Sequence, residues 1–216
     1  KYMKTFLVIG AGTCGPHLCN EVAKQKCEIM VVDSEEEHLG DLLNVVTSAR
    51  IADCTNREAL ESLDIPSFDV CFVCLRDSFQ SILVVTYMLK ELGAKKVLSR
   101  ASDDTQALFL KRNGADGVIY PFKEMAERLA ISESNDRIFD CIPMTKDYYV
   151  YEISPRADWV GKSIKDLDFR NRFHMNILAV KDSEGEVFPN PSFQYVFKNE
   201  EHIMVLATDE DIRKVT

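Results

Sequence analysis

One segment of this 216-residue sequence has the spacing of a phosphate-binding turn. Gly10-Ala-Gly-Thr-Cys-Gly15 reads G-x-G-x-x-G, and it lies between an apolar run and a segment of helical periodicity. In that context Gly10 permits a tight turn, Gly12 lets a pyrophosphate approach the backbone, and Gly15 lets the helix pack on the strand. The helix N-terminus would offer unpaired N–H groups to the anion. The alternative is a glycine-rich turn that binds nothing.

An acidic residue completes this pattern. Asp33 lies 18 residues after Gly15, at the end of a second apolar run. A carboxylate at that position accepts hydrogen bonds from ribose hydroxyls. Residues 34–37 contain no arginine to receive a 2′-phosphate. The pair of motifs therefore predicts NAD or another adenine nucleotide and excludes NADP, although Asp33 could also be a simple helix cap.

Catalytic groups that would consume the nucleotide are missing from this sequence. No tyrosine is followed by a lysine four residues later, and no G-x-S-x-G segment occurs. The four histidines, His17, His38, His174 and His202, have no H-x-x-x-H metal-binding spacing. We therefore expect binding without turnover and no metal site. A small NAD-dependent oxidoreductase is the alternative function.

The cysteines predict structural rather than chemical roles. Their number is seven, which is odd, and we find no secretion signal, so a reducing cytoplasm is expected. Cys71 and Cys74 form a C-x-x-C motif inside the apolar run 69–75. Positions three apart on a strand point to opposite faces. We therefore expect two small buried side chains, without a shared metal or an easy disulfide.

Alternating strand and helix patterns must position these residues. Predicted strands are 5–9, 28–32, 50–52, 70–75, 96–99 and 117–120. Predicted helices are 14–25, 35–46, 56–63, 78–92 and 103–112, with Asn56 as an N-cap. Six strands alternating with five helices predict an α/β fold with a Rossmann-like, doubly wound parallel sheet.

The pattern changes after residue 120. We expect a helix at 123–131, a polar linker at 132–137, and then strands at 148–153, 176–181 and 202–208. A short helix at 163–167 and a turn at 182–185 lie among these strands, and the prolines at 189 and 191 are expected to break any strand there. The sequence thus predicts a nucleotide-binding domain at 1–137 and a small α+β lobe at 138–216.

Charge and hydropathy exclude two classes of function. Lys+Arg number 26 and Asp+Glu 35, which gives a net charge of −9. A nucleic-acid binder carries a basic surface, so that class is excluded. The longest dense apolar stretch is 82–89, far short of the about 20 residues that span a bilayer. A role at the membrane would therefore require a partner.

The ordered motifs resemble one family, the regulator-of-potassium-conductance domain (RCK or KTN). The resemblance rests on the glycine turn, Val31-Val-Asp33, Ala52-Asp-Cys-Thr-Asn56, residues 60–68 and Leu110-Lys-Arg-Asn-Gly-Ala-Asp-Gly-Val-Ile-Tyr-Pro121. The segments 160–167, 176–180 and 205–212 resemble the family's C-terminal lobe. The resemblance covers almost the whole chain. The length fits one N-terminal lobe and one C-terminal lobe, as in Ktr-type cytoplasmic subunits.

The resemblance implies a set of ligand-binding residues. The glycine turn would face the phosphates, Asp33 would hold the ribose, Asp53 and Cys54 would lie at the adenine, and Arg100 near the phosphates. The full expected site is Gly10, Gly12, Thr13, Cys14, Gly15, Asp33, Ser34, Asp53, Cys54, Leu75 and Arg100. The expected ligands are NAD or NADH, or another adenine nucleotide (AMP, ADP or ATP).

Two residues depart from the family pattern. Thr13 stands where many members carry a phosphate-contacting arginine, and Phe122 stands where triphosphate-sensing members carry a glutamate. Neither side chain offers a charge to a γ-phosphate or its metal. We therefore expect a ligand that does not depend on a γ-phosphate.

Assembly and partners follow from the same resemblance. The implied protein is a cytoplasmic regulatory subunit that gates a membrane potassium-translocating subunit and forms dimers or rings up to octamers. The apolar face of 78–92 is wide enough to cover a second subunit, or else it is covered within the monomer. Some family members bind a cyclic dinucleotide in the C-terminal lobe, where Arg172, Asn176, Ile177 and Pro191 would lie. The alternative there is a plain dimerisation lobe.

Overall fold

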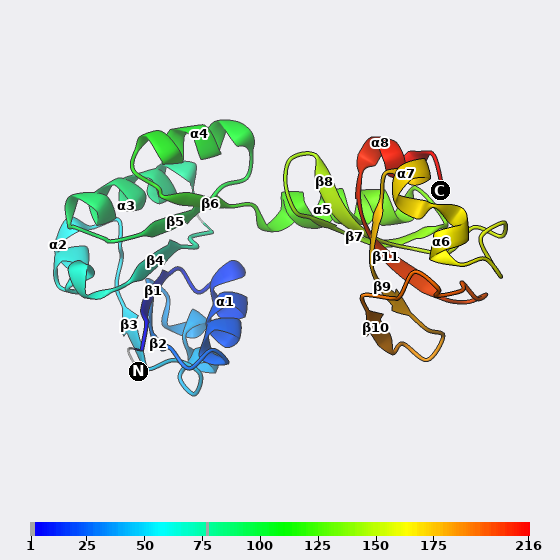
Figure 1. Ribbon diagram of the computed structural model, residues 1–216. Coiled ribbons are helices and arrows are strands. Elements are labelled where there is room, and N and C mark those ends of the chain that lie inside the picture. The colour runs from blue at the N-terminus through cyan, green and yellow to red at the C-terminus, as the bar shows by residue number, and fades with distance from the viewer. Residues whose placement is uncertain (1–2, 77) are drawn as a thin grey trace. The chain divides into compact units, whose positions relative to one another are not determined.

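A computed structural model describes residues 3–76 and 78–216 (Figure 1). The chain divides into two compact units, one up to residue 123 and the other from residue 124 to the C-terminus. The boundary between the units falls in the first turn of the helix α5 (Pro121–Glu133), whereas the sequence predicted a boundary after this helix, at residue 137. The assignment of residues 124–137 to the nucleotide-binding domain stays a prediction.

The first unit contains a six-stranded parallel sheet. Its strands are β1 (Thr5–Ile9), β2 (Glu28–Asp33), β3 (Ser48–Ile51), β4 (Val70–Val73), β5 (Val97–Arg100) and β6 (Gly117–Ile119). Their order is β3-β2-β1-β4-β5-β6. This confirms the predicted Rossmann-like, doubly wound sheet. The order reverses between β1 and β4, and the crevice at that point is where such sheets bind ligands.

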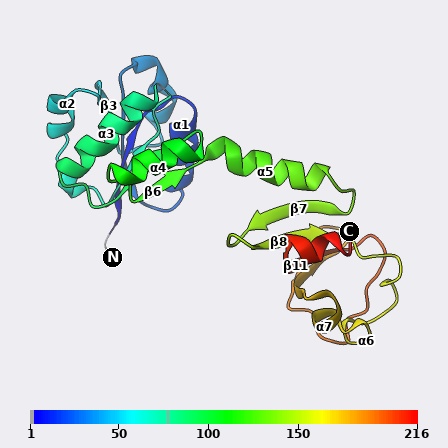
Figure 2. The ribbon, with the colours of Figure 1, turned by 90° about the horizontal axis from the view of Figure 1, so that it is seen from above.

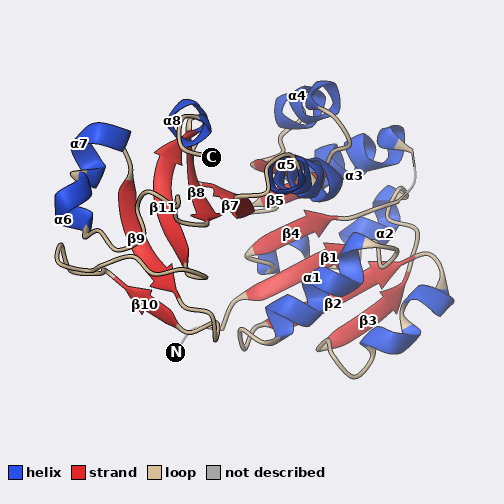
Figure 3. Cartoon of the chain, turned by 90° about the vertical axis from the view of Figure 1, so that its right-hand side faces the viewer, coloured by secondary structure: helices blue, strands red, loops and turns tan. Residues whose placement is uncertain are grey.

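Helices cover both faces of this sheet (Figure 3). They are α1 (Cys14–Ala23), α2 (Arg57–Glu61), α3 (Phe79–Glu91) and α4 (Asp104–Arg112). Alternation along β1 separates two cores, because Leu7 and Ile9 pack with α2, α3 and α4 while Val8 packs with α1. Asn56 caps α2 as predicted, its side chain accepting a hydrogen bond from the N–H of Glu58.

The predicted helix at 35–46 was wrong. Two short 3-10 helices stand there, η1 (Glu36–His38) and η2 (Gly40–Leu42), and a third, η3 (Ile65–Ser67), precedes β4. Gly40 interrupts the segment and is a poor residue for a helix interior. The two turns instead bury Leu39 and Leu42 against the face that α1 covers. Tertiary burial thus overrides the helical periodicity.

The second unit contains a five-stranded antiparallel sheet. Its strands are β7 (Ile138–Pro143), β8 (Tyr148–Ile153), β9 (Asn176–Lys181), β10 (Val187–Pro189) and β11 (His202–Thr208), in the order β10-β9-β11-β8-β7. Its helices are α5, α6 (Ile164–Leu167), α7 (Phe169–Phe173) and α8 (Asp209–Arg213). The α+β lobe is confirmed, with Trp159, Tyr151 and Phe197 fully buried in its core.

The strand predictions for this unit were incomplete, because β7 and β10 were missed. α5 ends at Glu133, two residues into the expected linker at 132–137. Both strands lie at sheet edges and end in a proline, Pro143 and Pro189. Proline is tolerated in edge strands, because the N–H group that it lacks would face solvent there and would not bond to a neighbouring strand. A proline therefore marked the end of a strand and not its absence.

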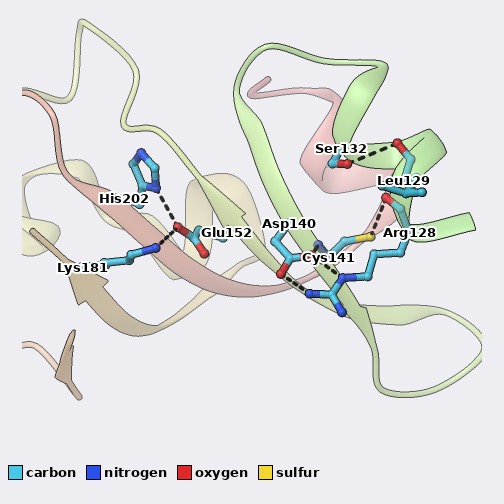
Figure 4. A network of polar contacts seen from close by, with 8 residues as sticks. All are labelled: Arg128, Leu129, Ser132, Asp140, Cys141, Glu152, Lys181 and His202. Atoms are coloured by element: carbon cyan, nitrogen blue, oxygen red, sulfur yellow. Dashed lines mark hydrogen bonds and ion pairs between the residues drawn. The ribbon is translucent and has the colours of Figure 1, made fainter. Parts of the chain in front are cut away.

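The helix α5 is held to β7 within the second unit, and Figure 2 shows the two running side by side. Arg128 forms a two-pronged ion pair with Asp140, and the thiol of Cys141 lies 3.8 Å from the carbonyl oxygen of Arg128 (Figure 4). In the described part of the chain, no helix is both long and apolar enough to cross a bilayer.

Candidate nucleotide-binding site

The turn between β1 and α1 has a geometry that requires glycine at two positions. Gly10 has φ +98° and donates its N–H to the carbonyl of Val32 at 2.8 Å. A Cβ on Gly10 would lie 2.8 Å from the backbone of Cys74, and one on Gly15 would lie 2.0 Å from the Gly10 carbonyl oxygen. Both distances are too short for any side chain. These two glycines hold the first turn of α1 directly above the end of β1.

Gly12 is different, because a Cβ there would meet no backbone atom at clashing distance. The three heavy atoms nearest to that Cβ all belong to the side chain of Arg76, at 3.5–3.9 Å. Thr13 is the N-cap of α1 but makes no side-chain capping bond, and the first turn contains no acidic residue. The first N–H groups of a helix have no partner within it and attract anions. The turn therefore has the form of a phosphate cradle and fits the predicted group.

Asp33, the last residue of β2, is buried and held by three donors. Its carboxylate accepts hydrogen bonds from the N–H of Ala11 at 2.6 Å, the N–H of Glu35 at 2.9 Å and Nδ1 of His38 at 3.1 Å. Burial works to raise the pKa of Asp33, but these hydrogen bonds lower it overall. Asp33 is thus an ionised acceptor that also ties the glycine turn to β2.

A small hollow lies where the strands end. Five predicted site residues line it together: Asp33, Ser34, Asp53, Cys54 and Leu75. Its other lining residues, which were not predicted, are Ile9, Val32, Ala52 and Thr55. These residues end or follow β1, β2, β3 and β4, as expected for a ligand site in a parallel sheet. The hollow adjoins the glycine turn through Ile9 and Asp33.

Asp53 and Cys54 differ in character within this hollow. The exposed carboxylate of Asp53 accepts hydrogen bonds from the hydroxyl and the N–H of Thr55, at 2.7 and 2.9 Å, and these lower its pKa. The thiol of Cys54 is buried, and burial beside Asp53 and Asp33 raises its pKa to about 12. One residue thus offers charge, while the other is a neutral wall.

Cys14 is the first residue of α1 and has an acidic thiol. Hydrogen bonding with the Cys74 thiol, followed by the electrostatic effect of the Arg100 guanidinium, lowers the pKa of Cys14 against the effect of burial. Cys74 faces the core that contains α1, whereas Cys71 faces the core that contains α3. The prediction of opposite faces is confirmed. Among the described residues, no cluster of three metal-ligating side chains occurs.

Arg100, the last residue of β5, is engaged within the protein. It donates a hydrogen bond to the carbonyl of Leu75 at 3.3 Å, and its guanidinium lies over the ring of Phe122, 5.6 Å from the centroid. Phe122, which departs from the family pattern, thus forms a cation–π contact with Arg100. Two residues that were not predicted to belong to the site contact it, His38 at Asp33 and Arg76 at Gly12. Neither belongs to a recognisable sequence motif.

A second cavity, of about 590 Å³, lies in the C-terminal lobe. Three of the four residues expected there line it, Asn176, Ile177 and Pro191. Arg172 does not; its guanidinium lies over the ring of Phe173. Arg170 lines the cavity instead and donates a hydrogen bond to Oδ1 of Asn176 at 2.8 Å.

Comparison with known proteins gives a consistent result for the whole chain. The chain is 28% identical over 211 residues to Ktr system potassium uptake protein C of Bacillus subtilis (strain 168), covering 98% of this chain and 95% of that protein. It is 25% identical to Ktr system potassium uptake protein A of Vibrio alginolyticus, covering 97% and 94%.

Solved structures share the fold at lower identity. The GsuK RCK domain matches 99% of this chain with a TM-score of 0.66 and 14% identity, and the GsuK channel bound to NAD matches 98% with a TM-score of 0.68 and 14% identity. This chain spans 47% and 38% of those two chains, respectively.

Family models account for both units. The TrkA-C domain model matches residues 148–216, and the TrkA-N domain model matches residues 6–121, more than half of the chain. The chain therefore belongs to the TrkA-N domain family, and its C-terminal lobe is a TrkA-C domain.

Proposed function

We propose that this protein is a nucleotide-sensing regulatory subunit of a potassium uptake system. The observation that carries the proposal is the joint placement of a glycine cradle at Gly12 and an ionised Asp33 at the switch point of the sheet. The full-length similarity to Ktr system potassium uptake proteins supplies the potassium role. A bound nucleotide would act by its different affinity for two conformations of the subunit.

The proposed ligand is NAD, NADH or another adenine nucleotide. Structural neighbours of the fold are described as bound to NAD, ADP and AMP. Asp33, Glu35 and Glu36 put negative charge where the 2′-phosphate of NADP would lie, so NADP should be rejected. Thr13 and Phe122 give no charge to a γ-phosphate, so ATP should have no large advantage over NADH, which carries a pyrophosphate but no γ-phosphate.

The test of the ligand is competitive binding of NAD, NADH, NADP, AMP, ADP and ATP at one ionic strength. ATP that binds ten-fold tighter than both AMP and NADH would contradict the proposal on the γ-phosphate, since about 1.4 kcal/mol would then come from groups that Thr13 and Phe122 do not supply. Loss of NADH absorbance with candidate carbonyl substrates would instead favour the oxidoreductase alternative.

The proposed partner is a membrane potassium-translocating subunit, reached from the cytoplasmic side. The proposed assembly is a homo-oligomer, from a dimer to an octameric ring. α3 buries Ile82, Val85 and Leu89 but leaves Val84 and Tyr87 well exposed, and the adjacent α4 exposes Leu108. The prediction that one monomer does not cover the whole apolar face of 78–92 is consistent with these exposures.

The C-terminal cavity is a proposed second ligand site. Its size suits a small molecule, and Arg170, Lys165 and Asn176 supply cationic and amide groups beside apolar Ile177 and Phe193. We propose a cyclic dinucleotide, with Arg170 in the role first expected for Arg172. Titration with cyclic dinucleotides, comparing Arg170→Ala with Arg172→Ala, tests it: only the first variant should lose binding.

A further inference from the structure

A cation beside the phosphate cradle would further stabilise a bound pyrophosphate, and neither of the two residues first considered, Thr13 and Arg100, supplies a free one. Thr13 carries no charge, and Arg100 is engaged by the carbonyl of Leu75 and the ring of Phe122. We propose that Arg76, in the loop after β4, is the guanidinium that binds the pyrophosphate at Gly12. This inference rests on the proposed nucleotide site and identifies the residue that selects pyrophosphate-bearing ligands there.

The side chain of Arg76 lies against Gly12. Its Cβ, Cδ and Nε lie 3.5, 3.7 and 3.9 Å from where a Cβ of Gly12 would stand. The side chain thus runs along the face of Gly12 that a pyrophosphate must approach. The loops after β1 and after β4 meet at the switch point, because these two parallel strands are neighbours in the sheet. The approach of Arg76 to Gly12 is therefore built into the topology.

The guanidinium of Arg76 is available to bind a ligand. Its side chain is exposed, and in the described part of the chain it has no ion pair or hydrogen bond. By contrast, Arg57, Arg128, Arg156 and Arg213 are each paired with a carboxylate. An unpaired guanidinium keeps its full capacity for a charged ligand.

The guanidinium group of Arg76 suits a pyrophosphate chemically. A guanidinium presents parallel N–H donors that match two phosphate oxygens, and such charge-assisted pairs are stronger than neutral hydrogen bonds. Together with the N–H groups of α1, Arg76 would enclose a pyrophosphate from two sides. The γ-phosphate of ATP needs no part in this contact, so Arg76 favours NAD, NADH and ADP over adenosine.

The experiment is calorimetric titration of the full chain with adenosine, ADP and NADH, using wild type, Arg76→Ala, Arg76→Lys and Arg112→Ala. Arg112→Ala is the matched control, since it removes the same charge at the C-terminal end of α4, and a helix that follows a strand of a parallel sheet ends at the edge away from the ligand crevice. Thermal unfolding of each variant without ligand checks that the fold is intact.

Arg76→Ala should weaken ADP and NADH binding about ten-fold or more while leaving adenosine binding unchanged, and Arg76→Lys should fall between. The inference holds if ADP loses at least about threefold more affinity than adenosine, with no such difference in Arg112→Ala. A smaller difference overturns it, even though the nucleotide site would stand. Wild type that binds none of the three ligands overturns the proposed function itself.

Discussion

Asp33 combines two tasks that are usually assigned to separate residues. It faces the hollow where a ribose would lie, and it fixes the glycine turn through the N–H of Ala11. Asp33→Ala should therefore weaken adenine-nucleotide binding by roughly 1–3 kcal/mol, because the ribose hydroxyls lose their acceptor. Calorimetry measures this loss, with ADP and 2′-deoxy-ADP as a matched pair of ligands.

The deoxy ligand separates the two tasks of Asp33. If the carboxylate binds the ribose, wild type should prefer ADP over 2′-deoxy-ADP and Asp33→Ala should show no preference. Equal affinities in wild type would remove Asp33 from the 2′-hydroxyl contact. A preference that survives in Asp33→Ala would assign that contact to another group.

Cys14 should form a thiolate at lower pH than an ordinary cysteine. Hydrogen bonding with the Cys74 thiol lowers the pKa of Cys14 below the roughly 8.5 of an ordinary cysteine. Alkylation of Cys14 by iodoacetamide should therefore reach half of its maximal rate below pH 8.5, because the thiolate is the nucleophile. Peptide mass spectrometry distinguishes Cys14 from the other cysteines, and half-maximal reaction near pH 8.5 would contradict the shift.

The partner of Cys14 provides the control. Removing the Cys74 thiol in Cys74→Ala deletes the largest contribution that lowers the pKa of Cys14, so the midpoint should move to higher pH. Saturating nucleotide should slow the reaction at every pH, since bound phosphates and a thiolate compete for the same helix N-terminus.

At the scale of elements, the β1–α1 turn separates folding from binding. Gly15→Ala places a methyl group 2.0 Å from the Gly10 carbonyl oxygen and should cost more than about 2 kcal/mol of unfolding free energy. The atoms nearest to a Cβ on Gly12 belong to the Arg76 side chain, at 3.5 Å or more, so Gly12→Val should keep the fold and block the pyrophosphate. Urea unfolding and nucleotide titration of both variants measure the two effects. Normal nucleotide binding by Gly12→Val would show that this turn is not the cradle.

Three strands of the C-terminal sheet are joined by a charged cluster (Figure 4). Oε1 of Glu152 on β8 accepts hydrogen bonds from Nδ1 of His202 on β11 at 2.6 Å and from Nζ of Lys181 on β9 at 3.0 Å. The His202 ring also stacks on Phe139 of β7, with 3.8 Å between centroids. Partial burial works to raise the pKa of Glu152, but these donors lower it overall.

This shift predicts a pH-dependent stability. Because the folded pKa of Glu152 lies below its unfolded value of about 4.3, the stabilisation is present above that value and is lost as the pH falls through the folded pKa. Glu152→Gln should cost roughly 1–2 kcal/mol of unfolding free energy at pH 7 and progressively less below pH 4. Urea unfolding at both pH values tests this, and an equal cost at each would exclude the ionised form of Glu152 as the cause.

At the scale of the whole molecule, the exposed residues of α3 and α4 predict self-association. Light scattering at micromolar concentration should give at least twice the monomer mass of 24.6 kDa. Tyr87→Asp combined with Leu108→Asp should shift the protein towards the monomer, because charges at an apolar interface are costly to desolvate. Glu91→Ala, also on α3, is a control. A monomeric wild type would contradict the prediction.

The sequence by itself determined the parallel sheet, the switch-point turn and the acidic residue at the end of β2. These features depend on local signals, namely alternation of apolar residues, glycines at fixed spacing and a carboxylate at the end of a strand. It also predicted the two-lobed order of the chain and the opposite orientation of Cys71 and Cys74, because the period of a strand fixes which face each residue takes.

Only the tertiary structure decided which side chains meet across the loops. His38 reaches Asp33 because two 3-10 turns replace the expected helix, and Arg76 reaches Gly12 because β4 is the neighbour of β1. Arg100 is drawn onto Phe122, and Arg170 rather than Arg172 faces the C-terminal cavity. Such contacts depend on strand order and on which residues the core buries, and neither is encoded in the spacing of any single motif.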